Sequence, residues 1–294
     1  MKKRGLNKKT ISEIGGIVIS ISADDYKLGV EESNAFLIHK SKINPDVRLR
    51  THCNTAIDCN WGETIFEAGS LWSMHHHLGN IIFSFPSQSS GQPPQRIAIL
   101  APDFRTGDIF TIAKDTHPNS LLSPLEYPLD ELLIINILSL GRGVLLHACG
   151  VCDRERGYLF AGSSKAGKST IAKLWKGKKD VTVLSDDRII IRKIDGRFWI
   201  YGTPWHGDAE VSSPEKAPLE KVFFLKHAKK NEIKKVSPID AISHLMVCSF
   251  PTFWDKKGME FTLKFCAELV QEIPCYELGF VPDESILDLV QDYK

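Results

Sequence analysis

The sequence of 294 residues lacks a surplus of charge of either sign, since 37 lysines and arginines stand against 36 aspartates and glutamates. A net charge of +1 gives no overall field that would draw the chain to a nucleic acid or a membrane surface. Lysine-rich stretches do occur, and we interpret them as solvated faces. The composition therefore predicts a protein with no nucleic-acid partner.

Long apolar runs are also missing. No stretch of about 18 uncharged apolar residues, the length that crosses a bilayer as a helix, occurs in the sequence. Met1–Arg4 followed by Ile11–Ile21 imitates a signal peptide, but Glu13 and the alternation of apolar residues with serines after Val18 interrupt its apolar core. We therefore expect a cytoplasmic protein without a membrane partner, whose polar N-terminal tail leads into a strand.

Cysteine is scarce, and its seven residues, an odd number, are scattered from Cys53 to Cys275. This pattern suits free thiols in a reducing compartment better than a disulfide framework. Cys149 and Cys152 form a C-x-x-C inside a predicted strand, where nothing would lower a thiol pKa, so we assign no redox or metal role. His75–His77 would alternate between the two faces of a strand, and we assign no metal site there.

Up to about residue 127 the chain reads as short β-strands separated by turn residues. The predicted strands are runs of β-branched and aromatic residues, namely Phe36–His39, Thr64–Glu67, Ile81–Phe85, Arg96–Leu100 and Asp108–Ile112. The segment Pro86–Pro94, rich in serine, glutamine and proline, is predicted to be a surface loop. We expect residues 1–127 to form a smaller, β-rich N-terminal domain.

After Pro128 the pattern changes to strands alternating with helices. Leu129–Leu140 is apolar nearly all round, which is typical of a helix buried between layers, and Lys168–Trp175 is a second predicted helix. The predicted strands are Val144–Val151, Gly157–Ala161, Val181–Leu184, Arg188–Arg192 and Val222–Leu225. This alternation predicts an α/β fold (α+β, with a mixed sheet) for residues 128–294, and His117–Pro128 is the connector between the two domains.

A complete phosphate-binding motif, G-x-x-x-x-G-K-[ST], follows the strand Gly157–Ala161. The glycines let successive backbone N–H groups turn inward around phosphate oxygens, and the helix that follows adds the positive end of its dipole. The motif predicts that ATP or a related nucleotide is the cofactor. The predicted nucleotide-binding residues are Gly162, Ser163, Ser164, Lys165, Ala166, Gly167, Lys168, Ser169 and Thr170.

Two side chains of this loop have chemical tasks in the prediction. Lys168 would reach the β- and γ-phosphates and take part in catalysis, while the Ser169 hydroxyl would be a ligand of Mg²⁺. Lys165 stands where many such loops have glycine, and it either adds a second cation near the phosphates or points to solvent.

An acidic pair, Asp186 and Asp187, ends the predicted strand Val181–Leu184, eighteen residues after Lys168. Carboxylates at the end of a strand beside a phosphate loop can hold the metal and orient or deprotonate the nucleophile. Because Ser-Asp-Asp is also ordinary turn chemistry, a turn or a helix cap is the alternative interpretation. His147 lies on the strand before the one that leads into the loop.

Taken together, His147-x-x-Gly150-Val151, the loop Gly162–Thr170 and Asp186-Asp187 resemble the C-terminal domain of HPr kinase/phosphorylase. The sequence around these motifs is most similar to that of HPr-kinase-like proteins found with peptide-modification gene clusters. The resemblance implies a fold shared with phosphoenolpyruvate carboxykinase. It also implies that His147 positions the acidic pair, that Asp186 is the catalytic base, and that Asp187 and Ser169 are Mg²⁺ ligands. The glycine-rich signature through which HPr kinases engage HPr is not present, and Trp205–Asp208 stands in its approximate place.

The leading functional hypothesis is a Mg²⁺-ATP-dependent kinase that acts on a hydroxyl, such as a serine of a peptide or protein. Two alternatives stay open: a catalytically silent nucleotide-binding regulatory module, and a carboxykinase-type enzyme acting on a small acid. For the first hypothesis, the turn-rich segment Gly202–Asp208 is expected to approach the γ-phosphate from the acceptor side. We expect His206 and Asp208 to line that side, with Asp208 or Glu210 assisting the metal through water. The sequence leaves a homo-oligomer open.

Overall fold

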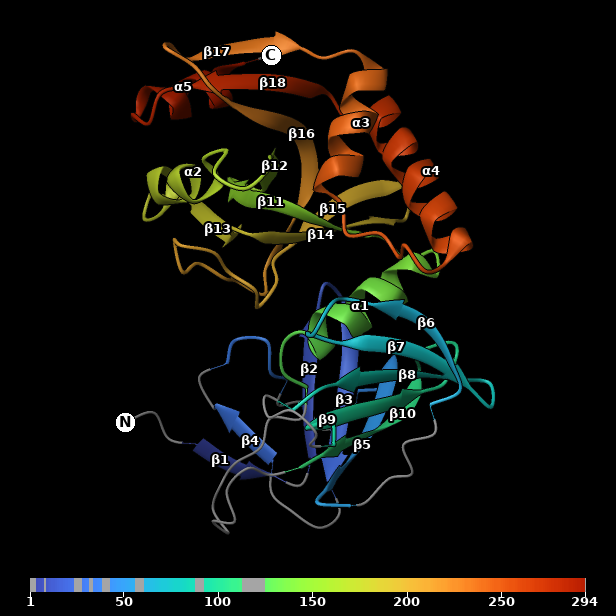
Figure 1. Cartoon of the computed structure of the whole chain (residues 1–294). Helices are drawn as coiled ribbons and strands as arrows, with labels where there is room; N and C mark the ends of the chain where they lie inside the picture. Colours follow the sequence, from blue (N-terminus) through green and yellow to red (C-terminus); the bar gives the residue numbers. More distant parts are fainter. Residues whose placement is uncertain are drawn as a thin grey trace. The chain divides into compact units, whose positions relative to one another are not determined.

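The computed structural model describes residues 4–7, 9–23, 28–31, 34–38, 43–55, 61–87, 93–112 and 125–293. The chain forms two compact units, unit 1 of Met1–Glu13 and Ile17–Ile137 and unit 2 of Ile14–Gly16 and Leu138–Lys294 (Figure 1). The two units divide within the helix α1 (Leu129–Ser139). The sequence instead predicted domains of residues 1–127 and 128–294, and that division of the chain stays a prediction.

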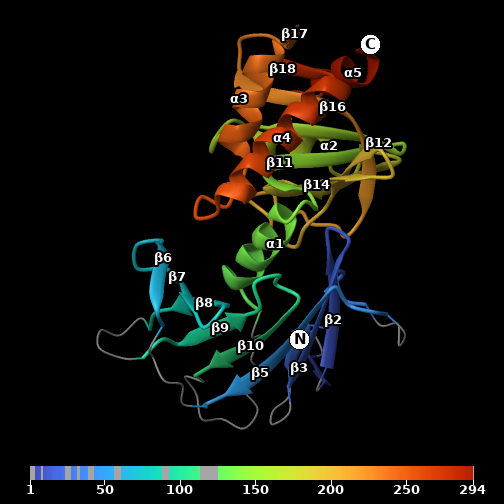
Figure 2. The same cartoon turned by 90° about the vertical axis from the view of Figure 1, so that its right-hand side faces the viewer.

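Unit 1 is built on an eight-stranded mixed sheet with the strand order β2-β3-β5-β10-β9-β8-β7-β6. Strand β5 pairs in parallel with both β3 and β10, and the pairs from β10 through β6 are antiparallel. The views agree that β5, β10 and β9 run side by side (Figure 2). The bounds are β2 (Lys9–Ile14), β3 (Ile17–Ala23), β5 (Val47–Cys53), β6 (Glu63–Glu67), β7 (Ser73–His77), β8 (Asn80–Phe85), β9 (Arg96–Leu100) and β10 (Thr106–Thr111); β1 (Arg4–Asn7) pairs only with β4 (Leu28–Glu31) among the described residues.

The β-rich character predicted for this part of the chain is confirmed, although one of the five predicted strands is wrong. Phe36 lies in a turn, and Leu37 makes a single bridge with Ser12. The cause is local, because Asn34 accepts a hydrogen bond from the Phe36 N–H through its side chain and another from the Leu37 N–H through its carbonyl. His39, most of the loop Pro86–Pro94 and residues 113–124 of the connector lie outside the described residues.

Unit 2 contains a second mixed sheet, in which the order β12-β11-β14-β15-β16-β18-β17 also brings β12 against β16. Five strands therefore close into a ring, since β12 pairs with β11 at one edge and with β16 at the other. The strand β13 pairs with the C-terminal half of β11. The bounds are β11 (Val144–Asp153), β12 (Arg156–Ala161), β13 (Val181–Ser185), β14 (Arg188–Ile194), β15 (Arg197–Tyr201), β16 (Lys216–His227), β17 (Glu232–Lys235) and β18 (Cys275–Phe280).

Helices cover both faces of the unit 2 sheet, as Figure 1 shows. On one face α3 (Pro238–Cys248) and α4 (Lys256–Glu272) bury Leu245 and Phe265 against strand side chains such as Leu146 and Ile189. On the other face α2 (Lys168–Trp175) and α5 (Ser285–Asp292) bury Trp175 and other apolar side chains in a separate core cluster. The predicted mixed α/β fold class is confirmed, and unit 2 is a three-layer arrangement.

The elements that the sequence predicted after Pro128 are present. Helix α2 has the predicted bounds, and α1 ends one residue earlier than predicted, with Glu131 and Asn136 buried beside its leucines and isoleucines. The predicted strands all fall within β11, β12, β13, β14 and β16. Among the described residues, no helix combines the length and apolar character needed to span a bilayer.

Candidate functional site

The loop from Gly162 to Gly167 connects β12 to α2, so it lies where an apolar strand leads into the first turn of a helix. Gly167 directly precedes the helix with φ of 107°, a left-handed conformation that side chains disfavour. A Cβ atom at this position would lie 2.4 Å from the Phe280 ring. Glycine is therefore required here twice, by the backbone conformation and by the closeness of β18.

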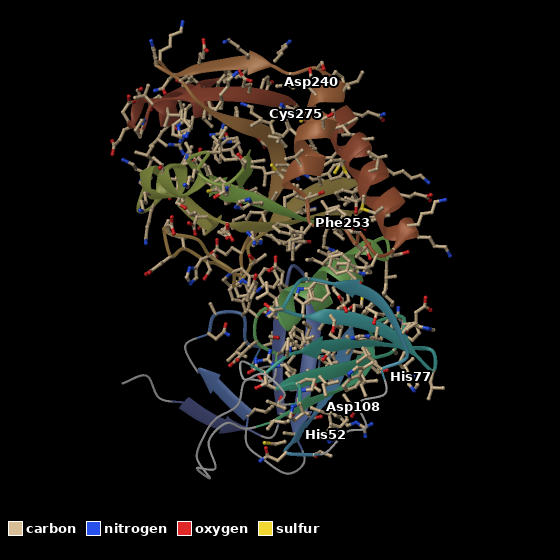
Figure 3. All side chains as sticks on the ribbon, viewed as in Figure 1. His52, His77, Asp108, Asp240, Phe253 and Cys275 are labelled. Carbon is tan, nitrogen blue, oxygen red and sulfur yellow. The ribbon has the colours of Figure 1, made fainter. Side chains whose placement is uncertain are left out.

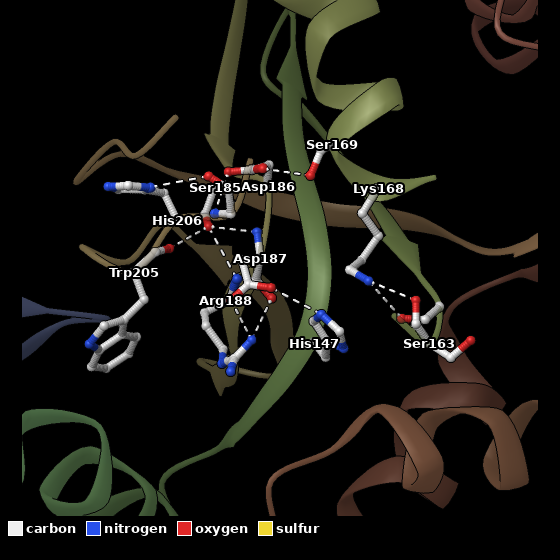
Figure 4. A network of polar contacts seen from close by, with 12 residues as sticks. His147, Ser163, Lys168, Ser169, Ser185, Asp186, Asp187, Arg188, Trp205 and His206 are labelled. Carbon is white, nitrogen blue, oxygen red and sulfur yellow. Dashed lines mark hydrogen bonds and ion pairs between the residues drawn. The ribbon is translucent and has the colours of Figure 1, made fainter. Parts of the chain in front are cut away.

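Lys168 is the first residue of α2, and only 6% of its surface is exposed. Its Nζ donates to the carbonyl oxygens of Gly162 at 3.0 Å and Ser163 at 2.9 Å, which holds the ammonium group against the loop (Figure 4). Burial lowers the pKa of Lys168, and the negative charge of Asp187 opposes this shift. The lysine is thus fixed beside the loop by short contacts.

The rest of the loop is more exposed. Lys165 has a φ of 67°, points to solvent with its neighbours Ser163 and Ser164, and accepts a hydrogen bond from His227 Nε2 through its backbone oxygen at 2.9 Å. Whether Lys165 adds a second cation near the phosphates stays a prediction.

Asp186 is the most enclosed acidic group of the site, with 1% of its surface exposed. Its Oδ2 accepts from the Ser169 hydroxyl and from the Ala209 N–H, both at 2.9 Å, and its Oδ1 accepts from the Gly207 N–H at 2.9 Å. A Cβ at Gly207 would lie 2.8 Å from Asp186 Oδ2, so only glycine permits this approach. One carboxylate thereby ties the start of α2 and residues 207–209 to the end of β13.

Asp187 faces a different set of partners. Its Oδ1 lies 3.0 Å from His147 Nε2, and it pairs with the Arg188 guanidinium (Figure 4). A quarter of its side chain is exposed. Burial alone would raise the pKa of Asp187, but the His147 hydrogen bond and the positive charges of Arg188, His147 and Lys168 outweigh it and hold the pKa below its ordinary value.

Phe250, which the sequence did not single out, completes this side of the site. The Arg188 guanidinium lies 4.3 Å from the centre of its ring, and the ring packs edge-on against His147 at 6.4 Å. The backbone of the segment after α3 is bound to β11, through Phe250 N–H to Leu145 O at 3.0 Å and a bridge between Ser249 and Leu146. No motif marks this Ser-Phe-Pro segment, because only the long-range pairing with β11 brings it to the site.

The segment Gly202–Asp208 lies beside Asp186, but it is held there by its backbone. Ser185 donates to the Trp205 carbonyl at 2.8 Å, and the fully buried Thr203 donates to the Arg188 carbonyl at 2.7 Å. The side chains expected to line the acceptor side are exposed, namely His206, Asp208 and Glu210. His206 contacts the carbonyl of Gly207 at 3.2 Å. The role of these three side chains stays a prediction.

The cysteine and histidine patterns that the sequence discounted lie in ordinary structural surroundings. Cys149 is fully buried on the α2 side of β11, and Cys152 packs on the opposite face of the same strand. Burial raises the pKa of the Cys149 thiol well above its usual range. His75 is buried and contacts Ser73 and Thr64, whereas His76 is exposed on the other face. Within the described residues, no group of three or more histidines, cysteines or carboxylates could hold a metal ion.

The chain matches no protein-family model and no curated protein. Among solved structures it is similar to the HPr(Ser) kinase/phosphatase from Coxiella burnetii, with 10% sequence identity and a TM-score of 0.28. The matched region covers 50% of this chain and 90% of that one. With a likeness of this size, the functional argument rests on the contacts described above.

Replacing Asp186 by asparagine is expected to destabilise the protein. The amide would keep one acceptor oxygen but turn its NH₂ toward a group that is itself a donor, and the buried charge-assisted bonds would be lost. We expect a loss of about 2–4 kcal/mol in the free energy of unfolding. Chemical denaturation measures it, and the exposed neighbour Asp208→Asn is the control, with a change within about 0.5 kcal/mol. Equal midpoints and slopes for both variants would contradict the tie that we assign to Asp186.

Replacing Gly167 by alanine should destabilise the protein more than the same change at Gly177. Both glycines have positive φ, at 107° and 78°, but nothing lies within 4 Å of a Cβ at Gly177, whereas Phe280 crowds Gly167. Both variants carry backbone strain, and Gly167→Ala adds the collision with Phe280, which costs about 1–3 kcal/mol. Thermal unfolding of the two variants tests this, and a Gly167→Ala protein as stable as Gly177→Ala would refute the crowding by Phe280.

Proposed function

We propose that the protein transfers a phosphoryl group from a Mg²⁺-bound nucleoside triphosphate, ATP or a related nucleotide, to a hydroxyl group. The observation that carries the proposal is the contact of 2.9 Å between the Ser169 hydroxyl and the buried Asp186 carboxylate, next to the phosphate loop and Lys168. A hydroxyl on the first turn of the helix, paired with a strand-end carboxylate, is the arrangement with which phosphate-loop proteins hold Mg²⁺.

The residues present fit both the nucleotide and the metal. The loop amides, the start of α2 and the Lys168 ammonium would hold the phosphates, because they gather positive charge at one place. Ser169 and Asp186 supply the hard oxygen atoms that Mg²⁺ prefers. When bound, Mg²⁺ would neutralise the negative charge that develops on the transferring phosphoryl group.

The contacts favour a division of the acidic pair that is the reverse of the one the sequence suggested. Asp186, expected to be the base, is almost fully enclosed and has donors on both oxygens, so we assign it to the metal side together with Ser169. Asp187, expected to be a metal ligand, is partly exposed and bound to His147, so we assign it to the acceptor hydroxyl. This division of roles is part of the proposal.

In the reaction, Asp187 would accept the proton of the acceptor hydroxyl while the oxygen of that hydroxyl bonds to the γ-phosphorus. The bond from that phosphorus to the β,γ-bridging oxygen breaks, and the nucleoside diphosphate leaves. The lowered pKa keeps Asp187 ionised at neutral pH. It is then a weak base, which suffices where the transition state is loose and the proton leaves late. His147, Arg188 and Phe250 would position this carboxylate, since each lies against it or against its partner.

The acceptor would be a hydroxyl on a peptide or protein, such as a serine side chain. The partial exposure of Asp187 supports an acceptor that comes from solution, as a macromolecular side chain does. In this proposal the exposed His206, Asp208 and Glu210 flank the approach of the acceptor. Gly207 and Ala209, which alternate with them, donate their N–H groups to Asp186 and hold the segment beside the acidic pair.

Replacing Lys168 by alanine should weaken the binding of Mg²⁺-ATP by at least about tenfold, because a charge-assisted contact to phosphate oxygen is lost. Calorimetric titration of the parent and the variant measures the change. Lys173→Ala is the matched control, since Lys173 lies on the same helix with its side chain exposed, and its affinity should equal that of the parent. If Lys168→Ala and Lys173→Ala bound Mg²⁺-ATP equally well, the loop would not be the nucleotide site.

Replacing Asp187 by asparagine should lower the rate of phosphoryl transfer by about 10²-fold or more, while the affinity for Mg²⁺-ATP changes little. The measurement is ADP formation from Mg²⁺-ATP with a pool of serine-containing peptides, alongside calorimetry. Asp195→Asn, in the exposed turn between β14 and β15, is the control and should retain the rate of the parent. A parent protein that binds Mg²⁺-ATP but forms no ADP would support the silent module instead, and unchanged turnover by Asp187→Asn would remove its role as base.

A further inference from the structure

Unit 1 has a hollow of about 750 Å³ on the face of its sheet where β3, β5 and β10 lie side by side. This volume is within the range of small-molecule sites, roughly 300–1,000 Å³. The hollow is not part of the phosphate-loop site, which belongs to unit 2. Cations and hydroxyl groups dominate its polar lining, namely Lys9, Arg48, Arg50, Ser20, Ser22 and Thr106.

The strand register explains why these groups share one face. Along β5 the residues alternate between buried and exposed, so Arg48 and Arg50 point to the face opposite Val47 and Leu49. Arg48 is level with Ser20 of β3 and with Thr106 of β10. The next row on the same face holds Ser22, Arg50 and Asp108. Two parallel rows of polar groups thus cross three strands.

The charges in the hollow are not balanced. Asp108 is the single carboxylate of its lining, and it is already engaged by His52 at 2.8 Å and by Arg50 at 3.4 Å (Figure 3). The Arg48 guanidinium donates to the neutral Asn44 side chain at 2.5 Å. Among the described residues, neither Lys9 nor Arg48 pairs with a carboxylate. Among the residues that line the hollow, three cations therefore stand against one carboxylate.

The hollow is half-open, and its lining combines apolar side chains with the polar rows. Ser20 lines the hollow and has only 6% of its surface exposed. Ile43 and Pro45 on one side and Ile99 on the other add apolar wall. Ligand sites combine such apolar walls with a few convergent polar groups.

We propose that this hollow binds a small molecule that carries two oxyanion groups, carboxylates or phosphates. Arg48 and Arg50 are two residues apart on one strand, which sets their Cα atoms about 6–7 Å apart. Each guanidinium presents a fork of donors suited to one oxyanion. Arg50 contacts Asp108 through Nε and its side chain is 67% exposed, so its terminal NH₂ groups can still face a ligand. The hydroxyls of Ser20 and Thr106 supply further donors beside them.

The test is calorimetric titration of the full chain with succinate and, separately, with inorganic diphosphate, to distinguish the two sources of oxyanion. The double variant Arg48→Gln/Arg50→Gln should lose at least about tenfold in affinity for the probe that fits. Arg105→Gln is the matched control, because Arg105 is exposed in the same unit and does not line the hollow. Binding by the phosphate loop is common to all three proteins, so it does not contribute to their difference.

A second variant separates a site from a diffuse charged surface. Ser22→Leu fills part of the hollow and leaves every charge in place, so it should also lose affinity, with unfolding midpoints close to the parent. Three results would overturn the proposal: neither probe binding at millimolar concentration, the double variant binding as well as Arg105→Gln, or Ser22→Leu retaining the affinity of the parent. The last result would indicate attraction by the surface charge alone.

Discussion

The candidate site depends on the need of one buried carboxylate for hydrogen-bond donors. Removing Asp186 from water to 1% exposure is costly unless its oxygen atoms are satisfied, and the donors come from Ser169, Gly207 and Ala209. These donors belong to the first turn of α2 and to a segment that follows β15. The carboxylate therefore fixes the phosphate loop and the 202–210 segment with respect to the same strand end, β13. A site assembled from distant parts of the chain is held together by this requirement.

The sheet of unit 2 brings the other groups to the same place. The long strand β11 pairs with β14 along its first half and with β12 and β13 along its second, so His147 stands where these pairings change. Strand β12 leads into the loop Gly162–Gly167, and the turn between β13 and β14 carries the acidic pair. The segment after α3 adds Phe250 from the far end of the chain. Since strands β12, β11, β14, β15 and β16 close into a ring, these positions are fixed by many paired backbone groups rather than by one loop.

Local signals in the sequence were enough for the loop and for many of the elements, but they could not supply the contacts. Helix α2 was predictable because a complete glycine motif precedes it, and α1 because it is apolar all round. Phe36–His39 misled, since its β-branched and aromatic composition was outweighed by the Asn34 hydrogen bonds, a local effect that composition does not express. The pairing of Asp186 with Gly207 and Ala209, and of Phe250 with Arg188, depends on contacts between residues far apart in sequence. Helices α3, α4 and α5 were not predicted, although Ser237, Pro238 and Asp240 mark the start of α3.

The two adjacent aspartates show why sequence alone left their roles undecided. Neighbouring residues at the end of a strand point in opposite directions, so Asp186 and Asp187 must enter different surroundings, but the order of the letters does not reveal which surroundings belong to which. In the structure the Asp186 carboxylate is buried and accepts from donors on both oxygens. The Asp187 carboxylate is partly exposed and contacts the His147 imidazole. A carboxylate whose oxygens already accept from fixed backbone N–H groups cannot turn toward a mobile acceptor without breaking those bonds. In the proposed reaction the partly exposed carboxylate of Asp187 can meet one, and His147, Arg188 and Phe250 would limit the directions from which it does so.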